Sequence, residues 1–274
     1  MTHPGGGRWV CLMYHDISAG AATNDGGPAR FAVPRAIFER QLDVIAEAGL
    51  RACSLEEAAA TADPHVAISF DDGDLGQYER GVPALVARGM SATFFVTTTW
   101  VGRPGYVTWD QLREMKAAGM SIQSHTHTHP FLSELDASAL RHELGESKRL
   151  LDTELGQDTT MLALPGGDWP SLRARGLLPE IGYRTVATSR WGVNRAAHGR
   201  GTARIVRRCT VQGSPPLDYF KRVMAGDAWL ASRRRVREAV LGRLRSTIGP
   251  SRYHRWRRSV LDAVAHPSRR ETNA

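Results

Sequence analysis

Short strand-like segments, several of them largely apolar, alternate with segments of helical periodicity along most of the chain, from about residue 36 to 210. The strand-like segments lie at residues 50–53, 66–70, 90–96, 120–124, 160–164 and 184–188. Between them apolar residues recur at helical spacing, as in Phe38, Leu42 and Ile45. Six or so strand–helix units predict an α/β fold with a parallel sheet, either open or closed as a barrel.

Polar residues mark where several of these helices begin. Ser54 stands three residues before Glu57, and Thr108 three before Gln111, which is the spacing of a capping box. Asp136 precedes a helix that we expect to end at Gly156.

The pattern changes after residues 215–216, where two prolines interrupt the chain. From residue 232 to 262, arginines alternate with apolar residues such as Val236 and Val240, which is typical of a basic amphipathic helix. We therefore divide the chain into a catalytic body, residues 1–230, and an Arg-rich helical tail, residues 231–274.

The net charge of +8 over 274 residues is unevenly distributed. Residues 232–274 contain twelve arginines and three acidic residues, a net +9, which leaves 24 basic and 25 acidic residues, a net −1, in the remainder. A nucleic-acid groove in the body is therefore not predicted. The tail is expected to pack on the body, to meet a partner or to contact an anionic membrane, and binding of nucleic acid is the least favoured reading.

No run of apolar residues is long enough to span a bilayer, and the first ten residues lack the pattern of a secretory signal. We expect a cytoplasmic protein, peripheral at the inner membrane face if the tail binds there. The three cysteines, Cys11, Cys53 and Cys209, are widely spaced and predict buried free thiols.

Two adjacent acidic residues, Asp71 and Asp72, follow the apolar run at 66–70. Ligands of parallel α/β folds bind at the carboxyl ends of strands, and neighbouring side chains point in different directions there. One carboxylate can hold a cation while the other handles a proton. Taken alone, the pair could equally be an acidic turn.

Three histidines, His125, His127 and His129, follow the next-but-one strand. Imidazole is a common ligand of transition metals, and two of these rings can converge on one ion if the chain turns between them. Together with a carboxylate from Asp71 or Asp72, they predict a metal site with an open coordination position.

These motifs resemble those of the polysaccharide deacetylase family, also called NodB-like or carbohydrate esterase family four, in its exopolysaccharide-processing branch. The resemblance rests on the segments 67–73 and 123–130 and extends over roughly residues 9–212. Shorter matching segments lie at residues 12–16, 93–96, 108–110, 146–148 and 182–184.

The resemblance implies a distorted (β/α) barrel of about seven units that holds Zn²⁺ or another divalent transition metal such as Co²⁺, Ni²⁺ or Mn²⁺. It implies Asp72, His125 and His129 as metal ligands, Asp71 as general base, and His15 as general acid. His127 is then not a ligand.

The chain departs from the family in its third motif. Residues 163–167 keep Pro and Gly but carry Ala163 where many members have an arginine that orients the base. The Gly166 amide can still stabilise an oxyanion. Arg195, Arg207 and Arg208 are candidates to replace the missing charge.

The expected activity is hydrolysis of the acetamide of an N-acetylated amino sugar, as a glycan or a lipid-linked precursor, to a free amine and acetate. Deacylation of a small metabolite and a non-catalytic carbohydrate-binding role are the alternatives. The predicted substrate contacts are Trp191, Asp168, Arg207 and Trp169, with Trp191 ranked first among the tryptophans near strand ends.

Overall fold

The computed structural model describes residues 7–20, 31–61, 65–195, 204–249 and 252–253. Within these residues a ten-stranded sheet follows the order β10-β1-β5-β6-β7-β8-β9-β11, with β12 beside β1 and β4 beside β5. Its strands are β1 (Arg8–Tyr14), β4 (Arg51–Cys53), β5 (His65–Phe70), β6 (Thr93–Val96), β7 (Ser121–Ser124), β8 (Met161–Ala163), β9 (Thr185–Thr188), β10 (Asn194–Arg195), β11 (Arg204–Arg207) and β12 (Cys209–Thr210). The short strands β2 (Ile17–Ser18) and β3 (Val33–Pro34) pair with each other.

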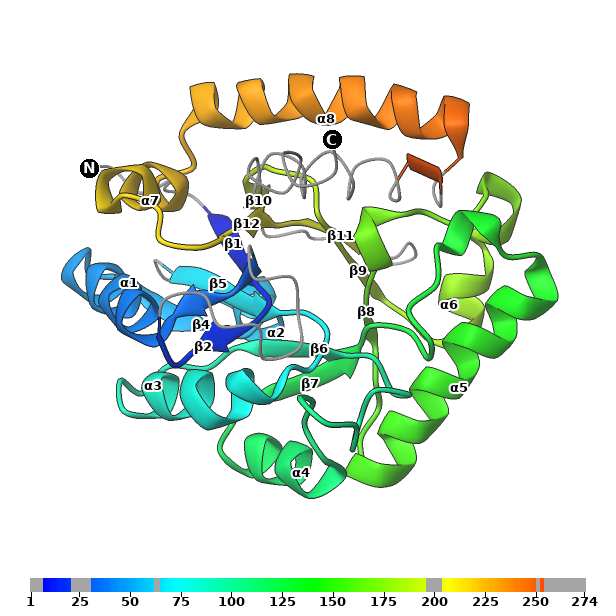
Figure 1. Cartoon of the computed structure of the whole chain (residues 1–274), viewed down its shortest axis with the longest axis horizontal. Coiled ribbons are helices and arrows are strands. Elements are labelled where there is room, and N and C mark those ends of the chain that lie inside the picture. The colour runs from blue at the N-terminus through cyan, green and yellow to red at the C-terminus, as the bar shows by residue number, and fades with distance from the viewer. Residues whose placement is uncertain (1–6, 21–30, 62–64, 196–203, 250–251, 254–274) are drawn as a thin grey trace, which may run out of the picture.

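The two ends of this sheet meet through β11 and β12. β11 pairs in parallel with β9, and after Arg208 the chain continues into β12, which pairs in parallel with β1 at Leu12 and Cys209. The sheet is thus a nearly closed barrel of β1, β5, β6, β7, β8, β9 and the β11–β12 segment (Figure 1). This confirms the predicted α/β barrel of about seven units.

Helices follow most of the strands and cover the outside of the barrel (Figure 1). They are α1 (Arg35–Glu47), α2 (Leu55–Ala60), α3 (Val82–Val86), α4 (Trp109–Ala117), α5 (Ala137–Leu155), α6 (Leu177–Ile181), α7 (Leu217–Met224) and α8 (Ala228–Ile248). Both predicted capping boxes are present, at Ser54 before α2 and Thr108 before α4. Asp136 caps α5, which ends at the left-handed Gly156 as expected.

Alternate residues of β1, β5 and β6 divide between two apolar clusters, as the period of two requires. In β1, Val10 and Leu12 join the large cluster that includes helix residues such as Phe38, whereas Cys11 joins a cluster drawn mostly from strands. The second cluster includes Ala67, Phe95, Ala163, Ala187 and Val206, so it fills the barrel interior. Because β5 alternates in the same way, Ser69 and Asp71 lie on the interior side with Ala67.

Several elements were not expected from the sequence, among them β11 and a π-helix. β11 has the sequence RIVR, in which only Val206 is buried, so it gives no apolar run. A π-helix, Gln77–Gly81, leads into α3. Single π-helical turns are frequent at functional sites.

Helix α8, which contains the first part of the predicted tail, starts at Ala228. Its first turns are tied to the body, where Leu230 is buried in the large cluster and the Arg234 guanidinium lies 4.9 Å from the Trp191 ring. Residues 254–274 of the predicted tail lie outside the described residues. Among the described helices, none combines the length and hydropathy needed to cross a bilayer. All three cysteines are buried thiols outside any disulfide, as predicted.

Candidate active site

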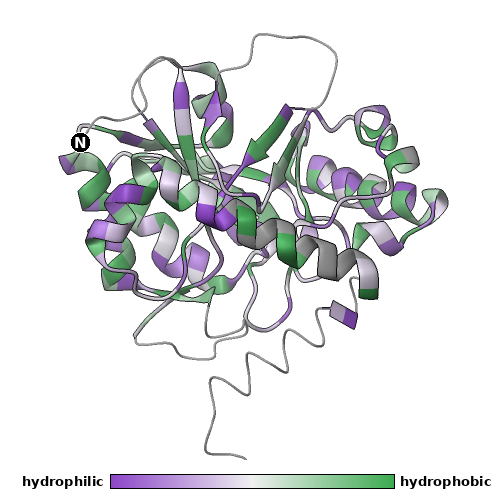
Figure 2. Cartoon of the chain, turned by 90° about the horizontal axis from the view of Figure 1, so that it is seen from above, coloured by the Kyte–Doolittle hydropathy of each residue, from purple (hydrophilic) through white to green (hydrophobic). Residues whose placement is uncertain are grey.

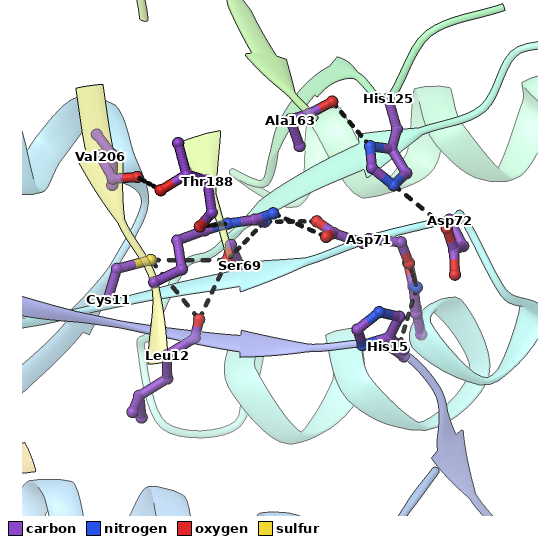
Figure 3. Close-up of polar contacts among 12 residues, drawn as sticks. Cys11, Leu12, His15, Ser69, Asp71, Asp72, His125, Ala163, Thr188 and Val206 are labelled. Carbon is purple, nitrogen blue, oxygen red and sulfur yellow. Dashed lines mark hydrogen bonds and ion pairs between the residues drawn. The ribbon is translucent and has the colours of Figure 1, made fainter. Parts of the chain in front are cut away.

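The carboxyl ends of the parallel strands bring the predicted chemical groups to one edge of the barrel (Figure 3). Asp71 and Asp72 follow β5, His125 follows β7, and His15 follows β1. The parallel register pairs Tyr14 with Phe70, so the residues just after these strands are neighbours. The predicted convergence of these segments is therefore present.

Asp72, His125 and His129 form a compact donor group. One ligand atom from each lies within 4.8 Å of the others. The Asp72 Oδ1 atom is 3.4 Å from His125 Nε2 and 3.6 Å from His129 Nε2. Two ligands of a tetrahedral ion at about 2.1 Å are separated by about 3.4 Å, so this spacing suits a shared Zn²⁺-sized ion.

The backbone around this donor group adopts an uncommon conformation. Among the described residues, three that are not glycine have positive φ, namely Asp72 at 80°, Thr126 at 71° and His129 at 63°. Such conformations cost about 1–3 kcal/mol each and concentrate at functional sites. Two of the three are members of the donor group, so the chain adopts unfavourable backbone conformations where it directs these donors.

The hydrogen bond on the far side of the His125 ring fixes which nitrogen faces Asp72. His125 Nδ1 lies 3.0 Å from the Ala163 carbonyl oxygen, which can only accept, so Nδ1 carries a proton. In the neutral ring, Nε2 then presents a lone pair to the Asp72 carboxylate (Figure 3). Two facing lone pairs repel unless a proton or a metal ion lies between them, so this pair of atoms can share either one.

The pKa directions of the donor group follow from burial and from its own charges. Burial and the neighbouring His125 lower the pKa of His129 to about 4, which keeps this imidazole neutral as a ligand must be. Burial would raise the pKa of Asp72, but the hydrogen bond from His125 and the nearby histidines prevail and hold it well below its usual range. Burial would lower the pKa of His125, and the carboxylates of Asp71 and Asp72 raise it instead.

Asp71 is held by an arginine that the sequence left as one of three candidates. Arg208 donates two hydrogen bonds, from Nη1 to Oδ1 at 2.5 Å and from Nη2 to Oδ2 at 2.8 Å. The Arg208 side chain is 0% exposed and that of Asp71 5%. Burial alone would raise the pKa of Asp71, but the Arg208 charge prevails and lowers it. Asp71 is therefore kept as an oriented carboxylate.

The position of Arg208 follows from strand alternation at the closure of the barrel. Arg207, its neighbour, is exposed on the other side, where its backbone pairs with the Asn194 side chain. Arg208 turns inward, donates from Nε to the Thr188 carbonyl oxygen and lies over the Phe95 ring. Arg195 is exposed in β10. Arg208 is thus the candidate that reaches Asp71, and Arg207 is not placed at the site.

His15 lies on the opposite side of Asp71 and Asp72 from His125 (Figure 3). Its charge is among the influences that lower the pKa of both carboxylates. Its ring lies against Phe31, with a centroid separation of 4.6 Å. A position beside both carboxylates is compatible with the predicted proton donor.

Gln77, in the π-helix, was not identified from the sequence. Its Nε2 donates to the main-chain oxygens of His15, at 2.9 Å, and Asp71, at 2.5 Å. The side chain is fully buried. Gln77 therefore joins the backbone of the candidate acid to that of the candidate base, and no sequence motif signals this role.

The loop after β8 lies beside the donor group, because Ala163 accepts from His125. Gly166 is exposed in this loop at φ 57°, where its amide was predicted to bind an oxyanion. Asp168, predicted to bind substrate, is buried and accepts a hydrogen bond from the Ser133 amide at 2.7 Å. Asp168 thus connects the loop after β8 to the segment that contains Ser133.

The predicted aromatic contacts are placed away from the donor group. Trp191 is only 4% exposed, in the large apolar cluster beneath Arg234. Trp169 is partly buried against a third apolar cluster, which includes Leu164 and Leu178, and it lies beneath Arg175. Trp100, in contrast, contacts a donor residue, because the centre of its ring lies 5.0 Å from that of His129.

His127 is also separate from the donor group, as the resemblance implied. Its Nδ1 lies 2.8 Å from Thr98 Oγ1, and its ring is near that of His142. His127 therefore joins the loops after β6 and β7 rather than facing Asp72.

The strand ends of this (β/α) barrel thus carry one carboxylate and two imidazoles, beside a second carboxylate that is ion-paired. This arrangement is typical of a metal site that catalyses hydrolysis. Comparisons with known proteins specify it further. The family model described as Polysaccharide deacetylase matches residues 58–186. These residues contain Asp71, Asp72, His125 and His129, so the part of the chain that carries the candidate site is similar to the polysaccharide deacetylase family.

Individual relatives agree. The chain is 32% identical over 163 residues to a putative polysaccharide deacetylase, YxkH, of Bacillus subtilis, covering 57% of this chain and 56% of the relative. Among solved structures, the deacetylase PplD of Streptococcus pyogenes, in complex with acetate, has a TM-score of 0.70 at 26% identity, covering 79% of this chain and 98% of that one. IcaB of Ammonifex degensii has a TM-score of 0.68 at 28% identity, covering 82% and 98%. The chain spans about half the length of the curated relatives it matches.

Proposed function

We propose that the protein is a metal-dependent N-deacetylase that hydrolyses the acetamide of an N-acetylated amino sugar to a free amine and acetate. The observation that carries this proposal is the convergence of Asp72, His125 and His129 beside an Asp71 carboxylate that Arg208 holds in place. The polysaccharide deacetylase match over residues 58–186 and the acetate in the related PplD structure support it.

The donor group fits a divalent transition metal, with Asp72, His125 and His129 as the residues that would hold it. A bound Zn²⁺ or similar ion would polarise the acetamide carbonyl and lower the pKa of water toward about 7. Three protein ligands leave a coordination position open, as catalytic sites require.

Asp71 acts as the general base in this proposal. Both oxygens of its carboxylate accept from Arg208, which keeps it ionised and fixes its orientation. It removes a proton from water as the water oxygen attacks the acetamide carbon. A positioned base of this kind contributes about 10²- to 10⁴-fold to the rate.

His15 and Gly166 complete the proposed reaction. The negative charge that develops on the acetamide oxygen is stabilised by the Gly166 N–H. His15 gives a proton to the departing amine nitrogen, so that the C–N bond breaks without forming an amide anion. Gln77 keeps the main chain of His15 and Asp71 at a fixed separation.

An acetate-release assay tests the proposal. The full chain, supplied with Zn²⁺, is assayed with N-acetylglucosamine oligomers, lipid-linked N-acetylated sugars and small N-acetylated amines. We expect release from at least one sugar substrate. Release from the small amines alone would favour a metabolite deacylase, and binding of oligomers without release from any substrate would favour a carbohydrate-binding protein.

A further inference from the structure

The exposed side of α8 carries apolar and basic residues together. Trp229, Val236 and Val240 are 55%, 66% and 62% exposed. They are seven and four residues apart, and Arg233 falls between them at helical spacing, so all four share one side of the helix. We call Trp229, Arg233, Val236 and Val240 the outer face of α8.

The body of the protein fixes the direction of this outer face. Leu230 and Arg234 are on another side of α8, where Leu230 is buried and Arg234 donates to Tyr219 Oη at 3.0 Å. The Asp227 carboxylate accepts from the amides of Trp229 and Leu230 and so begins the helix. α8 lies along one side of the barrel (Figure 1), and Figure 2 views the molecule from that side, with α8 in front.

Two arginines lie against the exposed indole. The guanidinium carbons of Arg233 and Arg222 are 4.7 Å and 5.4 Å from the Trp229 ring centre. An indole that is flanked by cations and lies beside exposed valines suits the boundary between lipid headgroups and acyl chains, because the ring has both an apolar body and a polar N–H group. The charge distribution also favours a negatively charged surface as the partner, since residues 232–274 carry a net charge of +9 and the remainder a net charge of −1.

We propose that the outer face of α8 binds the surface of an anionic membrane. Trp229, Val236 and Val240 would lie at the boundary between headgroups and acyl chains, and Arg222 and Arg233 would contact lipid phosphates. Charge complementarity favours an anionic surface. The two exposed valines favour lipid over nucleic acid, because they add nothing to contacts with a phosphate backbone but gain from leaving water.

Binding at this face leaves the candidate active site accessible. Leu230 of α8 lines the same cavity as Val10, which is near the amino-terminal end of β1. His15 follows the opposite end of that strand. The proposal therefore does not depend on the proposed catalytic function, and changes in the outer face are expected to leave the site intact.

Vesicle sedimentation of the full chain tests this inference. We expect the protein to sediment with vesicles of phosphatidylcholine and phosphatidylglycerol, less at high salt, and not with phosphatidylcholine alone. Val236→Glu combined with Val240→Glu should lower partitioning by about tenfold or more, since apolar contact is lost and each carboxylate meets anionic headgroups. Leu172→Glu, at a residue that is 78% exposed outside α8, is the matched control and should bind as the wild type does.

A second measurement keeps the inference testable if the double variant folds poorly. Brominated acyl chains should quench part of the tryptophan fluorescence of the wild type, and Trp229→Phe should remove that part. Equal sedimentation with neutral and anionic vesicles, or equal binding by the double variant and the wild type, would overturn the proposal. So would retention on a DNA duplex without retention on either vesicle.

Discussion

Arg208 donates hydrogen bonds to both carboxylate oxygens of Asp71 inside the barrel, although the two residues are 137 positions apart in the sequence. Both side chains are buried, at 0% and 5% exposure. The ion pair joins β5 to the β11–β12 segment that closes the barrel. Arg208 is a positioning residue, since it acts through Asp71.

Arg208→Met should therefore weaken both the fold and the proposed catalysis. Removing one partner of a buried ion pair strands the other charge, at a cost of about 3–5 kcal/mol in unfolding free energy. Chemical denaturation measures this free energy. Arg208→Met should lower the unfolding free energy less in the Asp71→Asn background than in the wild type, because Asp71→Asn leaves no buried carboxylate without a partner. Equal losses in both backgrounds would contradict the coupling.

The same pair predicts how activity divides between binding and turnover. Arg208→Lys keeps the charge but not the two parallel hydrogen bonds. We expect kcat for acetate release to fall while KM changes little, with Lys retaining more activity than Met. A change confined to KM would instead place Arg208 in substrate binding.

Asp72→Ala should abolish tight metal binding. Removing a residue that only hydrogen-bonds to a metal ligand typically weakens metal affinity by about 10- to 100-fold. Asp72 is itself one of the three proposed ligands, so its loss is expected to weaken affinity for Zn²⁺ by at least about 100-fold. Metal content after dialysis, measured by elemental analysis, checks this. His127→Ala is the control, since His127 contacts Thr98 rather than the donor group, and it should retain the metal. Equal metal content in both variants would rule out the assigned donor group.

His15→Gln should reduce turnover without loss of metal. If His15 donates the proton to the leaving amine, kcat should fall by about 10²- to 10⁴-fold. Metal content should equal that of the wild type, because His15 is not among the donors. Wild-type turnover in this variant would assign the proton to another group.

Lys148 predicts a pH dependence of stability that is independent of the site. Burial opposes its charge, but hydrogen bonds to Asp158 and Asp152 prevail and raise its pKa. A raised lysine pKa stabilises the fold fully below its unfolded pKa of about 10.4, and this contribution is lost as the pH rises through the folded pKa. The stability difference between wild type and Lys148→Met should therefore shrink above about pH 10.4. A difference that stays constant to pH 11.5 would exclude this linkage.

Much of the fold was predictable because it is encoded locally. The capping boxes at Ser54 and Thr108 and the stop at Gly156 depend on neighbours three or four residues away, and each is present. The place of the donor group was predictable for a similar reason, since the acidic pair and the histidines directly follow predicted strands, but the choice of Asp72, His125 and His129 came from the family resemblance. Barrel closure was not, because β11 contributes a single buried residue and no apolar run.

The choice among the arginines shows where sequence reasoning ends. Arg207 and Arg208 are adjacent and chemically identical, and only the strand alternation at the closure directs one inward. Trp191 shows the same limit, because a tryptophan after a strand can face a site or the core. Here α8 covers the segment, and Arg234 lies over the Trp191 ring. Gln77 acts through main-chain oxygens, which no motif records.

The most direct test of the central claim is acetate release from N-acetylglucosamine oligomers by the full chain and by Asp71→Asn, with metal content measured in the same samples. We predict that both proteins contain equal amounts of metal. The wild type should release acetate, chelation should abolish this release and Zn²⁺ should restore it. In Asp71→Asn the rate of release should be lower by about 10²-fold or more. Equal release by the two proteins, or release unaffected by chelation, would contradict the account.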